Sequence, residues 1–371
     1  MKFLFVNFTG LGNTVLINPG INILKKNIKG SDISIISNDI DSDLELSKLN
    51  NDIDNTINFK QLSIFKKILF FKDLIIGKYK YIVLNSFSNP SLFFLISLFL
   101  ISNSHIVLPC YLKSFNKKKN KLFNFIKFYR NLFYKKKKLL VSDSITSNVH
   151  EIDANLKIIK KILPENILIN ESNKLNKISL NYEIDILKKL KIEEKNYICV
   201  QYSGAHGLKS PKIWNAEKSI ALVEKLSHLK TVVVIGNKRD NQTKNYEFLK
   251  NFNVIDLVGK TSLKETVSLL KFSLTNICYD SGIMHLCDAM GVKSISIIGP
   301  SNLDKIKPRN KFSDVLYEKV SCSPCLIGWY FDPKSMSELQ AYNQCKENFK
   351  CMELISIEKV INLVLHNYEK R

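Results

Sequence analysis

Short apolar segments alternate with helical patterns along both halves of the chain, and this alternation limits the folds open to it. The predicted strands of the first half are Phe3–Asn7, Ile33–Ser37, Tyr81–Asn85 and His105–Leu108. The predicted helices of the same half are Thr14–Lys26, Ile64–Ile76, Leu92–Ile101 and Val149–Leu163. Strands separated by helices favour a mostly parallel sheet wrapped by helices.

A second alternating series follows a polar stretch with little periodicity. Its predicted strands are Tyr197–Gln201, Thr231–Ile235, Val254–Leu257, Leu274–Cys278 and Ser294–Ile298. Its predicted helices are Ala216–Leu226, Asn241–Asn251, Leu263–Phe272 and Met284–Met290. We therefore predict an α/β chain with two Rossmann-like doubly wound domains facing a cleft. The predicted parts are an N-terminal domain over 1–165, a linker over 166–177, a second domain over 178–320, and a Cys-rich tail with a C-terminal helix over 321–371.

The chain is strongly basic, with a formal net charge of +21 over 371 residues. Such a charge attracts nucleic acid, anionic lipid surfaces or phosphorylated substrates, although a solvated lysine-rich surface explains it equally well. Residues 113–138 hold eleven basic residues, seven aromatic residues and no acidic residue. This stretch suits an anionic membrane interface, a nucleic acid, or a helix with a buried aromatic stripe and a solvated basic face.

Targeting signals and membrane spans are not predicted. Met1 and Lys2 lead directly into the first predicted strand, which leaves no apolar signal core. The most apolar run, Leu92–Ile101, is shorter than the roughly 20 residues that a membrane-spanning helix needs. We expect a cytoplasmic protein that is peripheral on the inner face of the cytoplasmic membrane.

The most informative motif is the turn that begins at Tyr279. Asp280, Ser281 and Gly282 follow an apolar strand pattern and open a helical pattern that contains His285. A helix start leaves backbone N–H groups free and carries about half a positive charge, so it binds anions such as a diphosphate. Ser281 can cap this helix, and Gly282 lets a ligand approach the backbone.

Three further turns also join a predicted strand to a predicted helix. Gly10, Gly12 and Asn13 follow the first strand, where the glycines serve either ligand approach or packing. Gly204 and Ala205 begin a loop that leads to Lys212, whose ammonium can neutralise a phosphate. Asp240 either accepts a hydrogen bond from a ribose hydroxyl or caps the next predicted helix.

Taken together, these motifs resemble glycosyltransferase family 9, the ADP-heptose–lipopolysaccharide heptosyltransferase group. The resemblance is carried by Gly-Leu-Gly-Asn near the start, Gly-Ala and Lys-Ile-Trp in the middle, Gly-Lys-Thr-Ser-Leu, and Asp-Ser-Gly-Ile-Met-His-Leu. It implies a GT-B fold and an inverting, metal-independent transfer of a sugar from a nucleotide-sugar donor to a lipid-linked or surface glycan acceptor.

The resemblance also implies roles for individual residues. The donor would be held by Gly204, Ala205, Lys212, Asp240, Asp280, Ser281, Gly282 and His285, and the acceptor side would be formed by Gly10, Gly12 and Asn13. The resemblance implies that heptosyltransferases carry an aspartate at the position of Asn13, where it serves as the general base for the acceptor hydroxyl. Asparagine cannot take a proton, although it can orient a hydroxyl by hydrogen bonding. Another group then acts as the base, the substrates differ, or the chain is impaired.

The eight cysteines fall into two sets. Cys110, Cys199, Cys278 and Cys287 lie in or beside apolar segments, as small core residues do. Cys322, Cys325, Cys345 and Cys351 lie in a loop-rich tail, and the first two have C-x-x-C spacing. Four thiolates fit a structural Zn or Fe site, although plain thiols or a labile disulfide fit the spacing as well.

We therefore predict a glycosyltransferase that needs no cofactor for its chemistry. Its predicted partners are a nucleotide-sugar donor, a glycan acceptor and an anionic membrane surface. A nucleotide-sugar-binding protein without catalysis is the first alternative, because Asn13 cannot act as a base. A nucleic-acid-binding protein ranks last, because it gives no reason for the nucleotide-type turns of the second half, and we predict no nucleic-acid partner.

Overall fold

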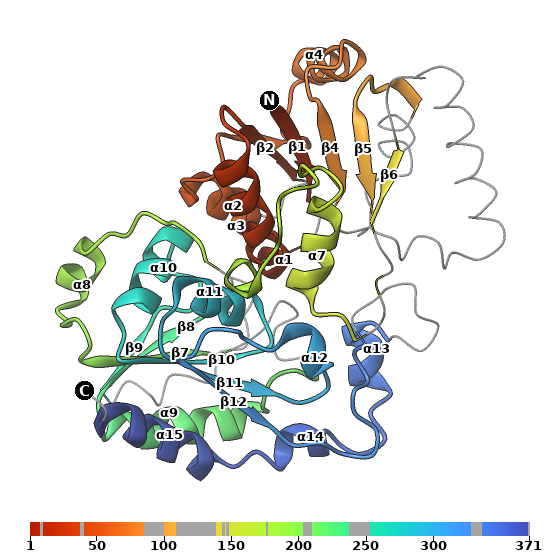
Figure 1. The fold of residues 1–371 in the computed structure, drawn as a ribbon. Coiled ribbons are helices and arrows are strands. Elements are labelled where there is room, and N and C mark those ends of the chain that lie inside the picture. Colours follow the sequence, from red (N-terminus) through yellow and green to blue (C-terminus); the bar gives the residue numbers. More distant parts are fainter. Residues whose placement is uncertain are drawn as a thin grey trace. The chain divides into compact units, whose positions relative to one another are not determined.

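The computed structural model describes residues 1–7, 10–37, 41–84, 100–108, 139–142, 145, 148–175, 177–202, 210–236, 253–327 and 336–369. The chain divides into two compact units, Met1–Leu180 and Asn181–Arg371. Each unit consists of one parallel sheet and the helices around it (Figure 1). Two doubly wound α/β units confirm the predicted fold class.

The sheet of the first unit has the strand order β3-β2-β1-β4-β5-β6 in the described residues. Its strands are β1 (Lys2–Val6), β2 (Asp32–Ser37), β3 (Asn55–Asn58), β4 (Tyr81–Leu84), β5 (His105–Leu108) and β6 (Leu139–Val141). All neighbouring strands are parallel, and Phe3 of β1 lies opposite Ile33 of β2 and Tyr81 of β4. The strand order reverses direction between β1 and β4, which is where sheets of this kind bind ligands.

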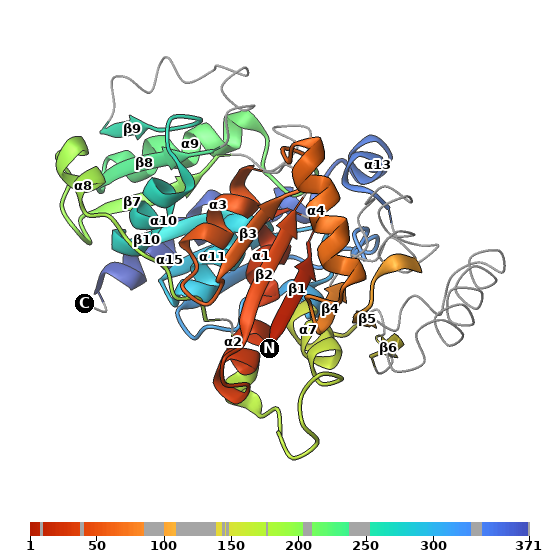
Figure 2. The same ribbon diagram turned by 90° about the horizontal axis from the view of Figure 1, so that it is seen from above.

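Helices pack on both faces of this sheet. They are α1 (Leu11–Leu16), α2 (Asn18–Asn27), α3 (Asp41–Leu49), α4 (Ile64–Ile75), α7 (Glu151–Ile159) and a short 3₁₀ helix, η2 (Glu171–Lys174). Alternate residues of β1 point to opposite faces: Phe3 and Phe5 pack with α2 and α7, whereas Leu4 and Val6 pack with α4. Figure 2 shows α4 lying along its face of the sheet.

The predicted helix Thr14–Lys26 is wrong in its bounds, because two helices occupy this region. α1 begins already at Leu11, and its chain turns at Ile17 before α2 starts at Asn18. Pro19 explains the break, since proline lacks an N–H group and fits only the first turn of a helix.

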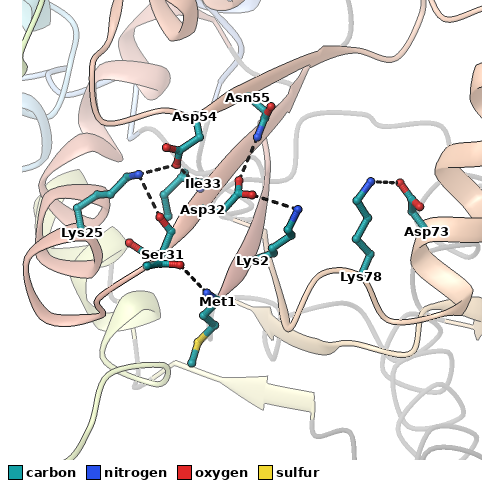
Figure 3. Close-up of polar contacts among 11 residues, drawn as sticks. Met1, Lys2, Lys25, Ser31, Asp32, Ile33, Asp54, Asn55, Asp73 and Lys78 are labelled. Atoms are coloured by element: carbon teal, nitrogen blue, oxygen red, sulfur yellow. Dashed lines mark hydrogen bonds and ion pairs between the residues drawn. The ribbon is translucent and has the colours of Figure 1, made fainter.

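Polar contacts hold the edge of the first sheet where β1 and β2 begin (Figure 3). The Asp54 carboxylate accepts from the Lys25 ammonium at 2.5 Å and from the Ile33 backbone N–H at 2.6 Å. The Asp32 carboxylate lies 3.2 Å from the Lys2 ammonium and accepts a hydrogen bond from Asn55 at 3.0 Å. Burial favours the neutral form of Asp54, but these hydrogen bonds and Lys25 outweigh it and hold the pKa of Asp54 below its ordinary value.

The predicted linker residues 166–177 belong to the first unit, whose boundary falls after Leu180. The Lys177 carbonyl accepts hydrogen bonds from the side chains of Asn18 and, at 2.8 Å, Asn22. Asn51 and Leu180 extend this attachment, since the Asn51 N–H donates to the Ser179 carbonyl at 3.0 Å.

The second unit repeats the topology of the first. Its strands are β7 (Tyr197–Gln201), β8 (Thr231–Ile235), β9 (Val254–Asp256), β10 (Thr275–Tyr279), β11 (Ser294–Ile298) and β12 (Ser313–Tyr317). Their order in the described residues is β12-β11-β10-β7-β8-β9, so the reversal falls between β7 and β10. All neighbouring strands are again parallel.

Helices also cover both faces of the second sheet. They are α8 (Asp185–Leu190), α9 (Ala216–Ser227), α10 (Leu263–Phe272), α11 (Gly282–Met290), α12 (Leu303–Ile306), α13 (Glu338–Asn343), α14 (Lys350–Glu353) and α15 (Ile357–Glu369). α9 and α15 lie on one face, and α10 and α11 lie on the other (Figure 1). Ile355, Val360 and Val364 are buried in the main core, so the C-terminal tail is part of the second unit.

Candidate functional site

The reversal point of the second sheet brings the ends of β7 and β10 together. Gln201, the last residue of β7, accepts at its side-chain Oε1 from the Ser281 hydroxyl at 2.8 Å and from the Tyr279 N–H at 3.4 Å. Ser281 follows β10 and caps α11, because its Oγ accepts from the Ile283 N–H at 3.2 Å. The predicted cap at Ser281 is confirmed, and the start of α11 opens at the edge of the sheet where doubly wound folds bind their ligands.

A buried ion pair lies at this edge. The Lys212 ammonium is 3.0 Å from Asp280 Oδ2 and 3.6 Å from Glu338 Oε2. Only 8% of the Asp280 side chain and 24% of the Lys212 side chain are exposed. The Ser301 hydroxyl donates to the same Asp280 oxygen, and the Ser210 hydroxyl donates to Glu338. One cation is therefore held between two carboxylates, each of which also accepts from a hydroxyl.

The charges of this group stabilise one another. Burial favours neutral Asp280, but the Lys212 charge and the Ser301 hydrogen bond outweigh burial and hold the pKa of Asp280 below its ordinary value. Burial likewise works against the Lys212 ammonium, yet Asp280 and Glu338 raise the pKa of Lys212 above its ordinary value. Asp280 and Lys212 are thus both ionised at neutral pH.

His285 in the first turns of α11 is buried beside the same charges. Burial lowers the pKa of His285 to about 4; the charge of Lys212 acts in the same direction, whereas that of Asp280 opposes it. At neutral pH the imidazole is therefore uncharged, and it can donate one hydrogen bond and accept another. His285 is suited to contact a neutral polar group rather than to balance a phosphate charge.

Residues of the C-terminal tail form hydrogen bonds with the two loops that lead to Lys212 and Ser301. The Trp214 indole N–H donates to the Met352 carbonyl at 3.0 Å, and the ring packs edge-to-face on Tyr279 with centroids 6.5 Å apart. Trp214 is fully buried and packs just before the start of α9. At the next loop, the Leu326 N–H donates to the Pro300 carbonyl at 2.9 Å, beside Ser301.

Glu338 is one of the site residues that the sequence analysis missed. It lies in the first turn of α13, whose capping box pairs Ser337 with Gln340. The Ser-x-x-Gln spacing is a signal from which the start of this helix could have been predicted. Its contact with Lys212, 126 positions away, has no such local signal. Gln201 was likewise predicted only as part of a strand.

Asn13 and its neighbours lie in the first unit, after β1. Gly10 precedes α1 with φ −61°, a conformation open to any residue, so the turn itself does not require glycine there. Within the described residues, a Cβ atom on Gly10 would meet nothing within 4 Å. Asn13 is half-buried, and Thr14 accepts from the Asn7 side chain at 2.6 Å, which ties the end of β1 to α1.

Several predicted residues lie outside the described residues, and the structure says nothing of them. Among the candidate donor contacts these are Gly204, Ala205 and Asp240. The basic and aromatic stretch 113–138 and Cys110 are also outside, as are most of the predicted helix Leu92–Ile101 and all of the predicted helix Asn241–Asn251. Cys199, Cys278 and Cys287 are described and buried, as expected for small core residues.

The four tail cysteines lie near enough to influence one another. Burial and the neighbouring thiols raise the pKa of Cys325 and that of Cys351, each to about 11. Four thiolates are a donor set that Zn or Fe accepts. In the part of the chain that the structure describes, however, no three or more His, Cys, Asp or Glu side chains are arranged to hold a metal ion.

The chain is similar to known proteins over much of its length. Residues 148–328 match the model of "Glycosyltransferase family 9 (heptosyltransferase)". E. coli ADP-heptose lps heptosyltransferase II superposes with a TM-score of 0.65 at 15% identity, over 99% of this chain and 100% of that one. The chain is thus similar to glycosyltransferase family 9 over residues 148–328, and it shares its fold with a solved heptosyltransferase.

Two further known proteins are similar to the chain. Lipooligosaccharide heptosyltransferase 2 of Campylobacter jejuni is 27% identical over 159 residues, which is 41% of this chain and 45% of that protein. The match thus spans less than half the length of this curated relative. The iron-containing dodecameric glycosyltransferase TibC from enterotoxigenic E. coli superposes with a TM-score of 0.58 at 11% identity, over 100% of this chain and 76% of TibC.

The structure also bears on the membrane expectation. Among the residues it describes, no helix combines the length and the apolar character that crossing a bilayer requires.

Proposed function

We propose that this chain is a family 9 glycosyltransferase that transfers a heptose-like sugar from an ADP-linked diphosphate donor to a lipopolysaccharide-core, lipooligosaccharide or other surface glycan acceptor, with inversion and without a catalytic metal. The names of the matched proteins support the donor and the acceptor, since they include an ADP-heptose enzyme and a lipooligosaccharide heptosyltransferase. We place the reaction at the cytoplasmic face of the membrane, because its acceptor would be lipid-linked.

The observation that carries the proposal is the ammonium of Lys212 beside the start of α11. The free N–H groups of a helix start and a nearby lysine both stabilise negative charge. In an in-line displacement at the anomeric carbon, negative charge grows on the departing diphosphate. Lys212 and the α11 N–H groups, including that of Gly282, would stabilise that charge more as the bond breaks, which lowers the barrier.

The other residues of the cluster would orient the donor. Asp280 holds Lys212 in place and, with Ser281, offers oxygens to sugar hydroxyls. Neutral His285 would contact an uncharged polar part of the donor. Gly204, Ala205 and Asp240 are proposed donor contacts from the resemblance, and Gly10, Gly12 and Asn13 are proposed acceptor contacts.

The acceptor hydroxyl must lose a proton, and Asn13 cannot take it. Asn13 would orient the hydroxyl while another base accepts the proton. The same residue favours a second candidate function, the binding of a nucleotide sugar without its transfer. The two functions differ in whether the donor is consumed when acceptor is present.

The test is turnover of ADP-heptose with a heptose-deficient lipooligosaccharide, followed as ADP release, for wild type, Lys212→Ala and Lys225→Ala. Lys225 is the matched control, since it pairs with Glu358 in an exposed ion pair outside the cluster. We expect Lys212→Ala to lose about 100-fold or more in kcat/KM, the size seen when one charge-stabilising donor is removed. Unchanged turnover in Lys212→Ala would contradict the proposal. Donor binding with no turnover in wild type would favour the second candidate.

A structural metal on Cys322, Cys325, Cys345 and Cys351 stays a prediction, supported by the iron that TibC contains. No step of the proposed reaction depends on it. Zn or Fe retained by desalted protein and lost in Cys325→Ser would support it, and a folded metal-free preparation would contradict it.

A further inference from the structure

Helix α4 exposes a broad apolar surface. Its inner side is anchored by Phe70 and Leu74, which are buried in the core between α4 and the first sheet. Its outer side carries six large apolar side chains with exposed fractions from 42% to 79%. These residues, which we call the α4 outer face, are Ile64, Phe65, Ile68, Leu69, Ile75 and Ile76.

The outer face is continuous around the helix. At 3.6 residues per turn, its six members fall within an arc of roughly 140°. Phe70 and Leu74 fall on the other side of the helix axis. A helix on the surface of a soluble protein normally has one apolar side and one polar side, whereas α4 has two apolar sides. Among the described residues, the second side is exposed and takes no part in the core, and exposed apolar patches of this kind commonly mark a site of interaction.

The charge around the outer face is basic. Residues 59–80 contain six lysines (60, 66, 67, 72, 78 and 80) and one acidic residue, Asp73. Asp73 is already paired with the Lys78 ammonium at 2.5 Å (Figure 3). Lys72 is exposed and falls within the arc of the outer face, where its long stem can lie along apolar neighbours while its ammonium reaches outward.

The apolar side chains and the lysines together indicate what kind of partner the α4 outer face binds. Apolar side chains surrounded by lysines complement the interface of an anionic bilayer, where acyl chains lie directly beneath phosphate groups. With 12 residues, α4 is about 18 Å long and too short to cross a bilayer, so it can bind only in the plane of the interface.

We propose that the α4 outer face docks on an anionic phospholipid surface. The inference extends the proposed function, since it would hold the enzyme at the membrane that carries a lipid-linked acceptor. It does not depend on residues 113–138, for which a membrane contact was predicted from sequence. Among the described residues, we expect α4 by itself to bind the phospholipid surface measurably.

The test is co-sedimentation of the full chain with phosphatidylcholine vesicles, with and without phosphatidylglycerol. The test variant is Phe65→Ser with Ile68→Ser, at 68% and 60% exposure. The matched control is Leu168→Ser with Ile184→Ser, at 84% and 54% exposure, which removes two apolar side chains outside α4. The replaced side chains are exposed in both variants, so both should fold, which near- and far-ultraviolet circular dichroism would confirm.

We expect wild type and control to bind the phosphatidylglycerol vesicles and to lose binding as salt is added. The Phe65→Ser, Ile68→Ser variant should bind about tenfold less tightly, because two large apolar side chains no longer leave the water. Equal binding by the test variant and wild type would overturn the proposal. The proposal would also be overturned if the Phe65→Ser, Ile68→Ser variant differed from wild type in oligomeric state but not in vesicle binding. The outer face would then bind a second copy of the chain.

Transfer to a water-soluble acceptor fragment separates this inference from the proposed function. The Phe65→Ser, Ile68→Ser variant should keep that activity and lose its preference for vesicle-bound acceptor. Lys212→Ala should show the reverse, with normal vesicle binding and transfer reduced about 100-fold or more. Vesicle binding through α4 in a chain that transfers no sugar would support the docking surface and contradict the proposed function.

Discussion

The two units share one strand order and differ in the chemistry at the point where that order reverses. In the first unit, the sequence from residue 3 to residue 24 contains no charged side chain. The described polar residues after β1 are neutral: Asn7, Asn13 and Thr14. In the second unit, Lys212, Asp280 and Glu338 form a buried charged cluster beside the start of α11.

This difference shows that the topology supplies a place for a ligand but does not decide which ligand binds. A neutral turn suits a group recognised by hydrogen bonds, such as a sugar hydroxyl. A lysine beside a helix start suits a diphosphate. The predictions below test this division of roles, beginning with the largest expected effect.

The buried histidine of the second unit should make stability depend on pH. The folded pKa of His285 is about 4, because burial disfavours the imidazolium. The ordinary value in an unfolded chain is about 6.5. Between these values the unfolded chain binds a proton that the folded chain does not, so the free energy of unfolding falls as pH drops from 6.5 to 4. Over that range the loss should amount to about 3 kcal/mol.

Urea unfolding of wild type and His285→Gln at several pH values between 4 and 7 measures this effect. The variant should show a shallower decrease toward low pH. His366→Gln, which removes an exposed imidazole from α15, is the control. Parallel curves for wild type and His285→Gln would show that His285 is not buried as the structure has it.

Much of this fold could be predicted from sequence because its central strands are apolar and its helices periodic. The prediction missed β3 (Asn-Thr-Ile-Asn) and β12 (Ser-Asp-Val-Leu-Tyr). Both are edge strands, where polar residues replace the continuous apolar run of a buried parallel strand. The prediction also missed β6 (Leu139–Val141), because a three-residue strand is too short to give a recognisable pattern.

The site could be predicted only as far as local signals reach. Asp280, Ser281 and Lys212 were found because each follows or ends a strand, where doubly wound sheets bind ligands. Glu338 was not found, since its approach to Lys212 depends on how the tail packs on α9 through Trp214 and Met352. Contacts between distant segments leave no periodicity or spacing in the sequence.

Asn13→Asp tests whether the neutral first unit lacks only a base. The resemblance places the family's general base at this position, and a general base commonly contributes about 100-fold or more to rate. We expect Asn13→Asp to raise kcat about tenfold, because the new carboxylate can accept the acceptor's proton, and to leave the KM for the donor unchanged. Steady-state kinetics with both substrates measures the effect.

Asn27→Asp is the control for Asn13→Asp, since it adds the same charge at an exposed position near the end of α2. A lower kcat in Asn13→Asp, with wild type already fully active, would mean that Asn13 serves by hydrogen bonding and that the base lies elsewhere. The absence of a carboxylate at position 13 would then suit the reaction rather than impair it.

The smallest effect is expected at Glu338, the second carboxylate on Lys212. A bound diphosphate would compete with this carboxylate for the ammonium, which lies 3.6 Å from Glu338 Oε2. Glu338→Gln removes the competing charge, keeps the shape and leaves Asp280 to hold Lys212. We expect ADP to bind about fivefold more tightly, a gain of about 1 kcal/mol, as befits one partly exposed charge. Titration calorimetry of wild type, Glu338→Gln and the exposed control Glu358→Gln measures it. Weaker ADP binding in Glu338→Gln would mean that Glu338 positions Lys212 for the donor rather than competing with it, and the tail would then be a working part of the charged site.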